Sequence, residues 1–267
     1  MSPPLAASAI PVHSIIEGPA DAPVVILSHS LGASIDMWRP QAAVLARHLR
    51  VVRYDLRGHG LSPVPPGDYS IADLGADIVA LLDRRGIARA HLCGLSLGAM
   101  VSLWVAAHFP ERVSRLVVCC TSARLGPPAF WAERAALVRA QGTSAIADAV
   151  IGRWFTAPWL AANASNAARD AELRATIAAT SAQGYAGCCA AIEHMDLRPD
   201  LGAIRAATLA IAGADDPSTP PTQLEAIAAA IPRSRVQIVA AAHLANVEQP
   251  ERVTELILEH LQTEEEP

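Results

Sequence analysis

Short apolar runs alternate along this chain with longer stretches in which apolar residues recur every three or four positions. The short runs, several rich in valine and isoleucine, are typical of buried strands, and the periodic stretches are typical of helices with one apolar face. The predicted strands are residues 24–28, 51–54, 89–93, 113–120, 208–212 and 236–240. The predicted helices are residues 38–48, 71–82, 97–108 and 247–261.

Near-continuous apolar strands separated by helices predict an α/β fold with a mostly parallel sheet that is covered by helices on both faces. Residues 11–17 are expected to add an antiparallel strand at one edge. One long interruption breaks the alternation. Between the strand that ends near Cys120 and the strand that begins near Thr208, the chain is rich in alanine and carries helical patterns without a clear strand.

We interpret this interruption as a helical cap inserted into the sheet domain. The predicted division is 1–122 for the first part of the core, 123–190 for the cap and 191–267 for the second part of the core. Ligands of open α/β sheets bind at the carboxyl ends of the strands, so a cap over that edge would shape a pocket and exclude water from it.

The segment Gly94-Leu95-Ser96-Leu97-Gly98 follows an apolar strand and precedes a helix. This G-x-S-x-G pattern, in this context, is typical of a sharp strand-to-helix turn that exposes a serine hydroxyl. The glycines suit a turn in which backbone segments approach too closely for a Cβ atom. Ser96 is therefore the predicted nucleophile.

A serine hydroxyl needs a base to take its proton and a third group to orient that base. Of the nine histidines, His243 is the preferred base because it follows the last strand and precedes the final helix. Two adjacent aspartates, Asp215 and Asp216, follow the strand before it and are the candidates for the orienting carboxylate. Residue types alone do not separate the two.

The negative charge that develops on a substrate carbonyl oxygen requires two backbone N–H donors. One is expected from Leu97, the residue after the serine, at the start of a helix. The other is expected from Leu31, in the loop that follows the first core strand.

Charge and composition narrow the possible partners. The net charge of -5 argues against a nucleic-acid-binding surface. No apolar run is long enough for a membrane span, and residues 1–10 lack the Lys or Arg of a secretory signal, so we expect a cytoplasmic protein. The five cysteines, which include two adjacent pairs, are expected to be buried and reduced.

With these features together, the chain resembles the α/β-hydrolases, and more narrowly the 3-oxoadipate enol-lactonases. The resemblance extends from about residue 11 to residue 261. Features shared across the superfamily are the Gly-rich turn at 55–62, the turn around Ser96 and the segment that runs from His243 to residue 251. Closer to the enol-lactonases are residues 30–38, 121–131, 184–192 and 212–221. The superfamily pattern places the orienting acid at Asp216, whereas His29 departs from the residue that often precedes Ser-Leu-Gly in enol-lactonases.

The resemblance implies hydrolysis of a carboxylate-bearing enol-lactone to 3-oxoadipate in aromatic catabolism, through the β-ketoadipate pathway, without a metal or organic cofactor. Arg124 is the first candidate to bind the substrate carboxylate, with Arg134 and Arg153 as alternatives. Tryptophan side chains are expected to line the pocket; the candidates are Trp38, Trp131, Trp154 and Trp159. Arg57 is expected to have a structural role. The alternatives are another small-ester or lactone hydrolase, a cofactor-free perhydrolase, and a non-catalytic binding protein on the same scaffold. Oligomeric state stays open.

Overall fold

A seven-stranded sheet with the order β1-β3-β2-β4-β5-β6-β7 forms the centre of the protein. The structure is a computed structural model that describes residues 9–163 and 167–263. The strands are β1 (Ser14–Glu17), β2 (Val24–Ser28), β3 (Arg50–Tyr54), β4 (Ala90–Leu95), β5 (Val113–Cys119), β6 (Ala207–Gly213) and β7 (Ser234–Val239). The first strand pairs antiparallel with β3, and all the other pairs are parallel. The predicted α/β sheet, including its antiparallel edge, is thus confirmed.

Helices cover both faces of the sheet because the central strands are apolar on both sides. The core helices are α1 (Arg39–Leu45), α2 (Ile71–Arg84), α3 (Leu97–His108), α9 (Pro221–Ala230), α10 (Ala245–Glu248) and α11 (Pro250–Gln262). Helices α1 and α11 pack together on one face, and α2 and α3 pack together on the other. The short 3₁₀ helices are η1 (Ile35–Trp38), η2 (Pro110–Arg112), η3 (Thr143–Ile146) and η4 (Leu201–Ala203).

The last predicted helix is two helices in the structure, so the prediction of one helix over 247–261 was wrong. Gln249 has φ -128° and ψ 61° and separates α10 from α11, which begins at Pro250. Proline lacks an N–H to continue the first helix, and it disfavours helical backbone at the residue before it. Proline here starts a helix rather than lying within one.

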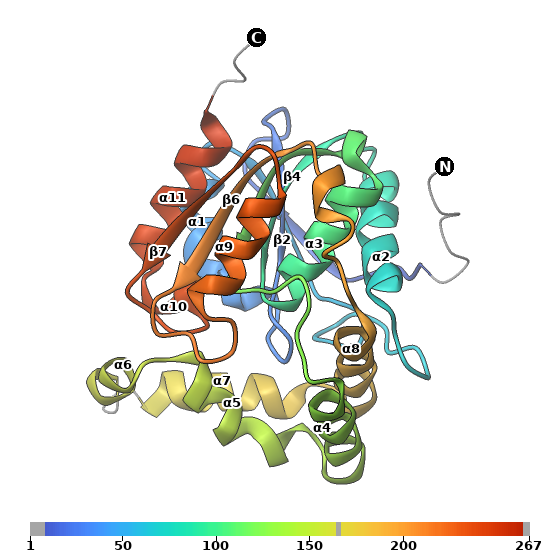
Figure 1. Cartoon of the computed structure of the whole chain (residues 1–267), viewed down its shortest axis with the longest axis vertical. Coiled ribbons are helices and arrows are strands. Elements are labelled where there is room, and N and C mark those ends of the chain that lie inside the picture. The colour runs from blue at the N-terminus through green and yellow to red at the C-terminus, as the bar shows by residue number, and fades with distance from the viewer. Residues whose placement is uncertain (1–8, 164–166, 264–267) are drawn as a thin grey trace.

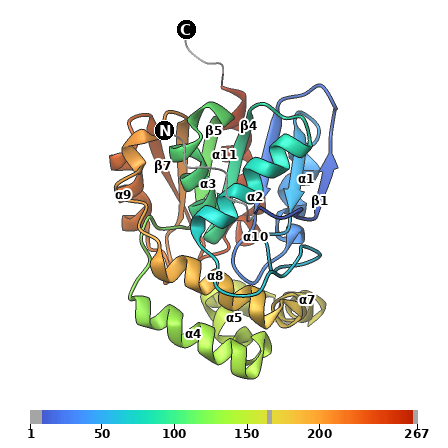
Figure 2. The same cartoon turned by 90° about the vertical axis from the view of Figure 1, so that its right-hand side faces the viewer.

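Five helices lie between β5 and β6 and form a layer beyond one end of the sheet (Figures 1 and 2). They are α4 (Pro128–Gln141), α5 (Ala147–Trp154), α6 (Ala157–Ala162), α7 (Ala167–Ala179) and α8 (Ala182–His194). We refer to this layer as the cap. Residue 190, where the predicted insertion ends, falls inside α8, because this helix continues without a breaking residue to His194.

All five cysteines are buried free thiols, as predicted. Within residues 9–163 and 167–263, no helix combines the length and the apolar character that crossing a membrane requires.

Candidate active site

Ser96 occupies a strained turn between β4 and α3. Its backbone angles are φ 55° and ψ -119°, a conformation that costs a non-glycine residue roughly 1–3 kcal/mol. Its N–H donates to the Cys119 carbonyl at 2.9 Å, and its own carbonyl accepts from Thr121 Oγ1 at 2.9 Å. These bonds hold the turn, and the Ser96 side chain borders a cavity under the cap.

The glycines on either side of Ser96 are required by contact distances. A Cβ on Gly94 would lie 2.4 Å from the Gly98 carbonyl carbon, and a Cβ on Gly98 would lie 2.3 Å from the Ser28 carbonyl oxygen. Backbone atoms cannot yield to such contacts without moving the turn. The two glycines therefore allow the strand, turn and helix to pack as closely as they do.

His243 lies after β7 and also borders this cavity, so the structure brings Ser96 and His243 to one site. Its Nδ1 lies 2.8 Å from Asp216 Oδ2. A carboxylate at this distance favours the tautomer with the proton on Nδ1, which leaves Nε2 free to accept a proton. The arrangement can therefore remove a proton from a nearby hydroxyl.

Asp216, rather than Asp215, reaches the imidazole. Asp216 is buried, and its carboxylate also accepts hydrogen bonds from Ser218 N, Thr219 N and Thr219 Oγ1 at 2.7–3.0 Å. Burial pushes its pKa upward, but the bonds from His243 and Thr219 outweigh burial and leave the pKa below its usual value. Asp215 is exposed to solvent. Asp216 thus stays ionised beside His243.

The amides of Leu31 and Leu97 are the candidate donors for a developing oxyanion. Leu31 borders the cavity, and Leu97 is the first residue of α3. Neither amide donates a hydrogen bond to another group in the described part of the chain. Buried N–H groups are usually satisfied, so two unsatisfied amides beside the candidate nucleophile suit an anionic ligand.

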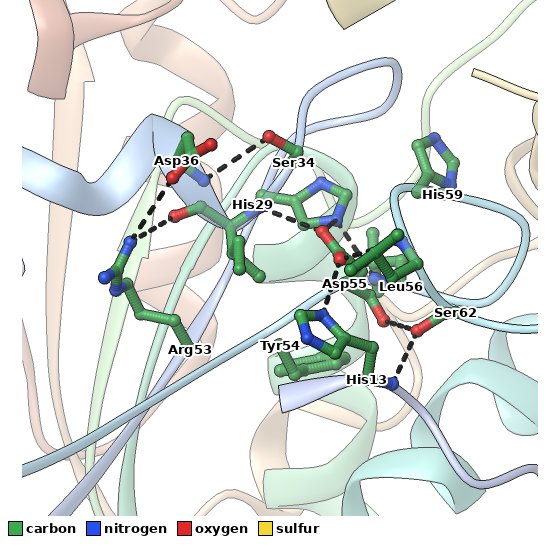
Figure 3. Close-up of polar contacts among 12 residues, drawn as sticks. His13, His29, Ser34, Asp36, Arg53, Tyr54, Asp55, Leu56, His59 and Ser62 are labelled. Atoms are coloured by element: carbon green, nitrogen blue, oxygen red, sulfur yellow. Dashed lines mark hydrogen bonds and ion pairs between the residues drawn. The ribbon is translucent and has the colours of Figure 1, made fainter. Parts of the chain in front are cut away.

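Two buried histidines support the loop that carries Leu31. His59 Nε2 accepts a hydrogen bond from Gly32 N at 3.0 Å, and His29 Nδ1 lies 2.7 Å from the Ser30 carbonyl. His29 Nε2 accepts from Leu56 N at 3.0 Å (Figure 3). Burial lowers the pKa of His29 and lowers that of His59 to about 3, so both rings are neutral and each can accept from a backbone N–H.

The Gly-rich turn after β3 is anchored through Asp55. One carboxylate oxygen accepts from Ile35 N, and the other contacts His13 Nδ1 and Leu61 N, all at 3.0–3.1 Å (Figure 3). Ser62 donates its hydroxyl to the Asp55 carbonyl. These contacts give the turn a structural role: it holds His59, and through His59 the Leu31 loop.

Arg57, in the same turn, has the structural role that was expected of it. It donates through Nε and Nη2 to the buried carboxylate of Asp77, and its guanidinium carbon lies 5.4 Å from the centre of the Tyr69 ring.

The cavity under the cap has a volume of about 240 Å³, and more of its surface is apolar than polar. Trp131 and Trp154 line it, as predicted for those two residues. Phe130, Val150 and Tyr185 also line it, although no pattern in the sequence singled them out as pocket residues. Among the described residues, no Asp or Glu side chain lines it.

Two arginines of the cap, Arg134 on α4 and Arg153 on α5, face this cavity. Their guanidinium carbons lie 5.0 and 5.8 Å from the centre of the Phe130 ring. In the described part of the chain, neither forms an ion pair with a carboxylate; Arg134 donates to Tyr185 Oη at 3.4 Å, and Arg153 donates to the Ala149 carbonyl at 3.1 Å. Burial, and then the charge of Arg134, lowers the pKa of Arg153. An anion bound between the two would relieve this repulsion.

Three of the residues that were predicted to bind the substrate or to line the pocket do not reach the cavity. Arg124 is exposed and is absent from the lining, because the chain turns at Ser122, whose hydroxyl bonds to both the amide and the carbonyl of Arg124. Trp38 is 0% exposed and packs in the core of the sheet domain. Trp159 lies outside the cavity and stacks on Phe155.

Among the residues that the structure describes, no group of three or more His, Cys, Asp or Glu side chains is arranged to hold a metal ion. The polar groups that the cavity offers are a serine, a histidine, backbone amides, two arginines and hydroxyls. They suit nucleophilic attack on the carbonyl of a small, negatively charged ester.

A strained serine turn at the carboxyl edge of a parallel sheet, with an Asp-supported histidine after the last strand, defines an α/β-hydrolase. Residues 23–250 match the family model of the alpha/beta hydrolase fold, and the chain belongs to this family of hydrolytic enzymes.

Among relatives, the chain is 41% identical over 234 residues to 3-oxoadipate enol-lactonase 2 of Acinetobacter baylyi, covering 88% of this chain and 86% of the relative. It is 36% identical to RutD of Variovorax paradoxus, a relative that is named as a carbamate hydrolase. The aligned region covers 79% of this chain and 80% of that relative. The crystal structure of the enol-lactonase from Burkholderia xenovorans superposes with a TM-score of 0.91 at 39% identity, covering 94% of this chain and 96% of that one.

Proposed function

We propose that this protein opens the ring of 3-oxoadipate enol-lactone by hydrolysis, with Ser96, His243 and Asp216 as its catalytic triad. The observation that carries the proposal is a cavity that holds Ser96, His243 and two arginines and that, in the described part of the chain, has no acidic lining residue and no carboxylate partner for either arginine. The enol-lactone offers the matching groups, a strained ester and a carboxylate arm. The similarity to enol-lactonases over most of the chain supports the same assignment.

In the first half of the reaction, Ser96 Oγ attacks the lactone carbonyl carbon while His243 Nε2 takes the hydroxyl proton. The amides of Leu31 and Leu97 stabilise the negative charge on the carbonyl oxygen. The ring C–O bond then breaks, and the enol oxygen that leaves takes the proton from His243. An acyl-enzyme on Ser96 results, whose tethered enol becomes a ketone.

In the second half, water attacks the acyl carbon and gives a proton to His243, and that proton returns to Ser96 Oγ as the ester bond breaks. The product is 3-oxoadipate, and the enzyme is regenerated. These steps call for no cofactor. Asp216 stays ionised throughout and stabilises the imidazolium that forms twice in each cycle.

The cap would bind the substrate carboxylate through Arg134 and Arg153, in place of Arg124. Charge-assisted bonds from two guanidinium groups suit a carboxylate, and the walls formed by Trp131 and Trp154 suit a small flat ring. A partner of this kind, a small carboxylate-bearing lactone, would fill the positive and apolar parts of the cavity at once.

The test is the loss of the ultraviolet absorbance of the enol-lactone on addition of purified protein, compared with hydrolysis of simple aryl esters. The proposal expects fast lactone opening and slower ester hydrolysis. Slow lactone opening with fast ester hydrolysis would assign the protein to general esterases instead. No turnover of any ester or lactone would favour a binding protein on the same scaffold.

A further inference from the structure

Glu248 connects the loop of His243 to the cap through one carboxylate. Its Oε2 accepts hydrogen bonds from Ala242 N at 2.9 Å and from Thr156 N at 3.3 Å, and its Oε1 accepts from Thr156 Oγ1. Ala242 directly precedes His243, and Thr156 lies in the linker between α5 and α6. The carboxylate is half-buried, which reduces the screening of these bonds by water.

A second bond joins the same two segments. Leu244 N donates to the Trp154 carbonyl at 2.9 Å. Ala242 and Leu244, which flank His243, are thus both connected to residues 154–156 of the cap. Ala242 is connected through Glu248, and Leu244 through its own hydrogen bond. On the cap side, the bonded residues are Trp154 and Thr156. Trp154 directly follows Arg153, and both Arg153 and Trp154 line the cavity.

From these contacts we infer that Glu248 is a positioning residue that fixes the substrate-binding part of the cap relative to the catalytic base. A substrate held by Arg153 would then present its carbonyl at a set position relative to His243. The inference rests on the proposed function, since it assumes that the cap arginines hold the substrate carboxylate. Displacement of about 1 Å between bound substrate and catalytic groups is enough to lower rates about a hundredfold.

Four variants separate this role from a general effect on stability. Glu248→Ala removes all three bonds, whereas Glu248→Gln can keep them: its oxygen can accept from the two amides, and its amide nitrogen can donate to Thr156 Oγ1. Thr156→Val removes the hydroxyl bond to Glu248, together with the bond at 3.3 Å by which Thr156 Oγ1 accepts from Trp159 N at the start of α6. Gln249→Ala is the matched control, because Gln249 Nε2 donates to the Ala240 carbonyl of the same loop at 3.0 Å and, among the described residues, Gln249 forms no hydrogen bond to the cap.

The kinetic readout is kcat/KM for the enol-lactone and for its methyl ester, which lacks the carboxylate charge. Glu248→Ala should lower the value for the lactone acid by about a hundredfold, and the value for the methyl ester by less than about tenfold. Thr156→Val should show the same preference with a smaller loss, and Glu248→Gln and Gln249→Ala should stay within about threefold of wild type. Equal losses on both substrates, or a Gln variant as impaired as the Ala variant, would overturn the inference.

A second readout needs no substrate. Hydrogen exchange of the linker around residues 154–157 should become at least about tenfold faster in Glu248→Ala and stay unchanged in Gln249→Ala. Unchanged exchange in Glu248→Ala would overturn the inference. A wild-type protein that does not open the lactone would instead refute the proposed function, and the tie between cap and loop would still be judged by exchange.

Discussion

The edge of the sheet and the cap hold their charged groups in opposite ways. At the sheet edge, Asp216 is surrounded by hydrogen-bond donors from His243, Ser218 and Thr219. In the cap, Arg134 and Arg153 face the cavity without a carboxylate partner in the described residues, and they repel each other. The difference suggests that the two regions have different functions. Groups that do chemistry are oriented before the substrate arrives, whereas groups that recognise it keep unsatisfied charge for the ligand.

The largest effect should come from the nucleophile at the sheet edge. Ser96→Ala removes the proposed nucleophile, so kcat for the enol-lactone should fall about a million-fold while the protein still folds. Ser218→Ala is the control: Ser218 borders the same cavity, but its contact with Asp216 uses its backbone N–H. Its kcat should change by less than about threefold. Wild-type turnover in Ser96→Ala would remove Ser96 from the mechanism.

The next largest effect should separate the two adjacent aspartates. Asp216→Asn removes the carboxylate that orients the His243 imidazole and stabilises the proton on its Nδ1, so kcat should fall about ten-thousand-fold. Asp215→Asn changes an exposed side chain and should leave kcat within about threefold. Steady-state kinetics of both variants checks this, and a larger loss at Asp215 would contradict the geometry described above.

In the cap, loss of a single arginine should cost less than loss of a group at the sheet edge. Arg134→Met or Arg153→Met removes a charge-assisted bond to the substrate carboxylate, which is worth about 1.5–3 kcal/mol, or roughly 10–100-fold in kcat/KM. Arg124→Met is the matched control, since Arg124 lies outside the cavity lining and should have little effect. If Arg124→Met were the most impaired of the three, the carboxylate would bind elsewhere.

The smallest expected effect is on the pH dependence of the free energy of unfolding. The pKa of His59 is about 3 in the folded protein and about 6.5 in an unfolded chain, so between these values only the unfolded chain binds the proton. Stability should therefore fall as pH falls from about 6 to 4, with His59 contributing about 1.4 kcal/mol per pH unit.

Urea unfolding at several pH values measures how the free energy of unfolding changes with pH. In His59→Gln, this change per pH unit should be smaller than in wild type by about 1.4 kcal/mol. His194 of the cap is exposed, so His194→Gln should keep the wild-type slope. Identical slopes in wild type and His59→Gln would mean that His59 is not a buried neutral ring.

The sheet edge could be predicted from the sequence because its signals are local. A Cβ on Gly94 would lie 2.4 Å from Gly98 within the same turn, so the pattern around Ser96 carries this part of the geometry with it. His243 and Asp216 follow strands of a parallel sheet, and the carboxyl ends of such strands meet at one edge. The order of strands and motifs was therefore enough to bring Ser96, His243 and the pair of aspartates to one edge, whereas the choice of Asp216 within the pair came from the superfamily pattern.

The cap could not be predicted to the same depth, because its site depends on how helices pack. Arg134 and Arg153 lie on different helices and meet at Phe130 only in three dimensions. Arg124 seemed the better candidate because it follows a strand, but a turn at Ser122 directs the chain so that its side chain is exposed. The two bonds from Thr156 to Glu248 likewise join residues 92 positions apart, and no local sequence pattern predicts them.

The proposed function joins a serine hydrolase core to a cap that binds the carboxylate of the lactone. The most direct test is kcat/KM of the wild-type protein for 3-oxoadipate enol-lactone and for the methyl ester of the same lactone, followed through the ultraviolet absorbance of the ring. We expect rapid opening of the acid and a kcat/KM that is about a hundredfold higher for the acid than for the ester, because one or two charge-assisted bonds contribute about this much. Equal rates for the two compounds, or no opening of either, would contradict it.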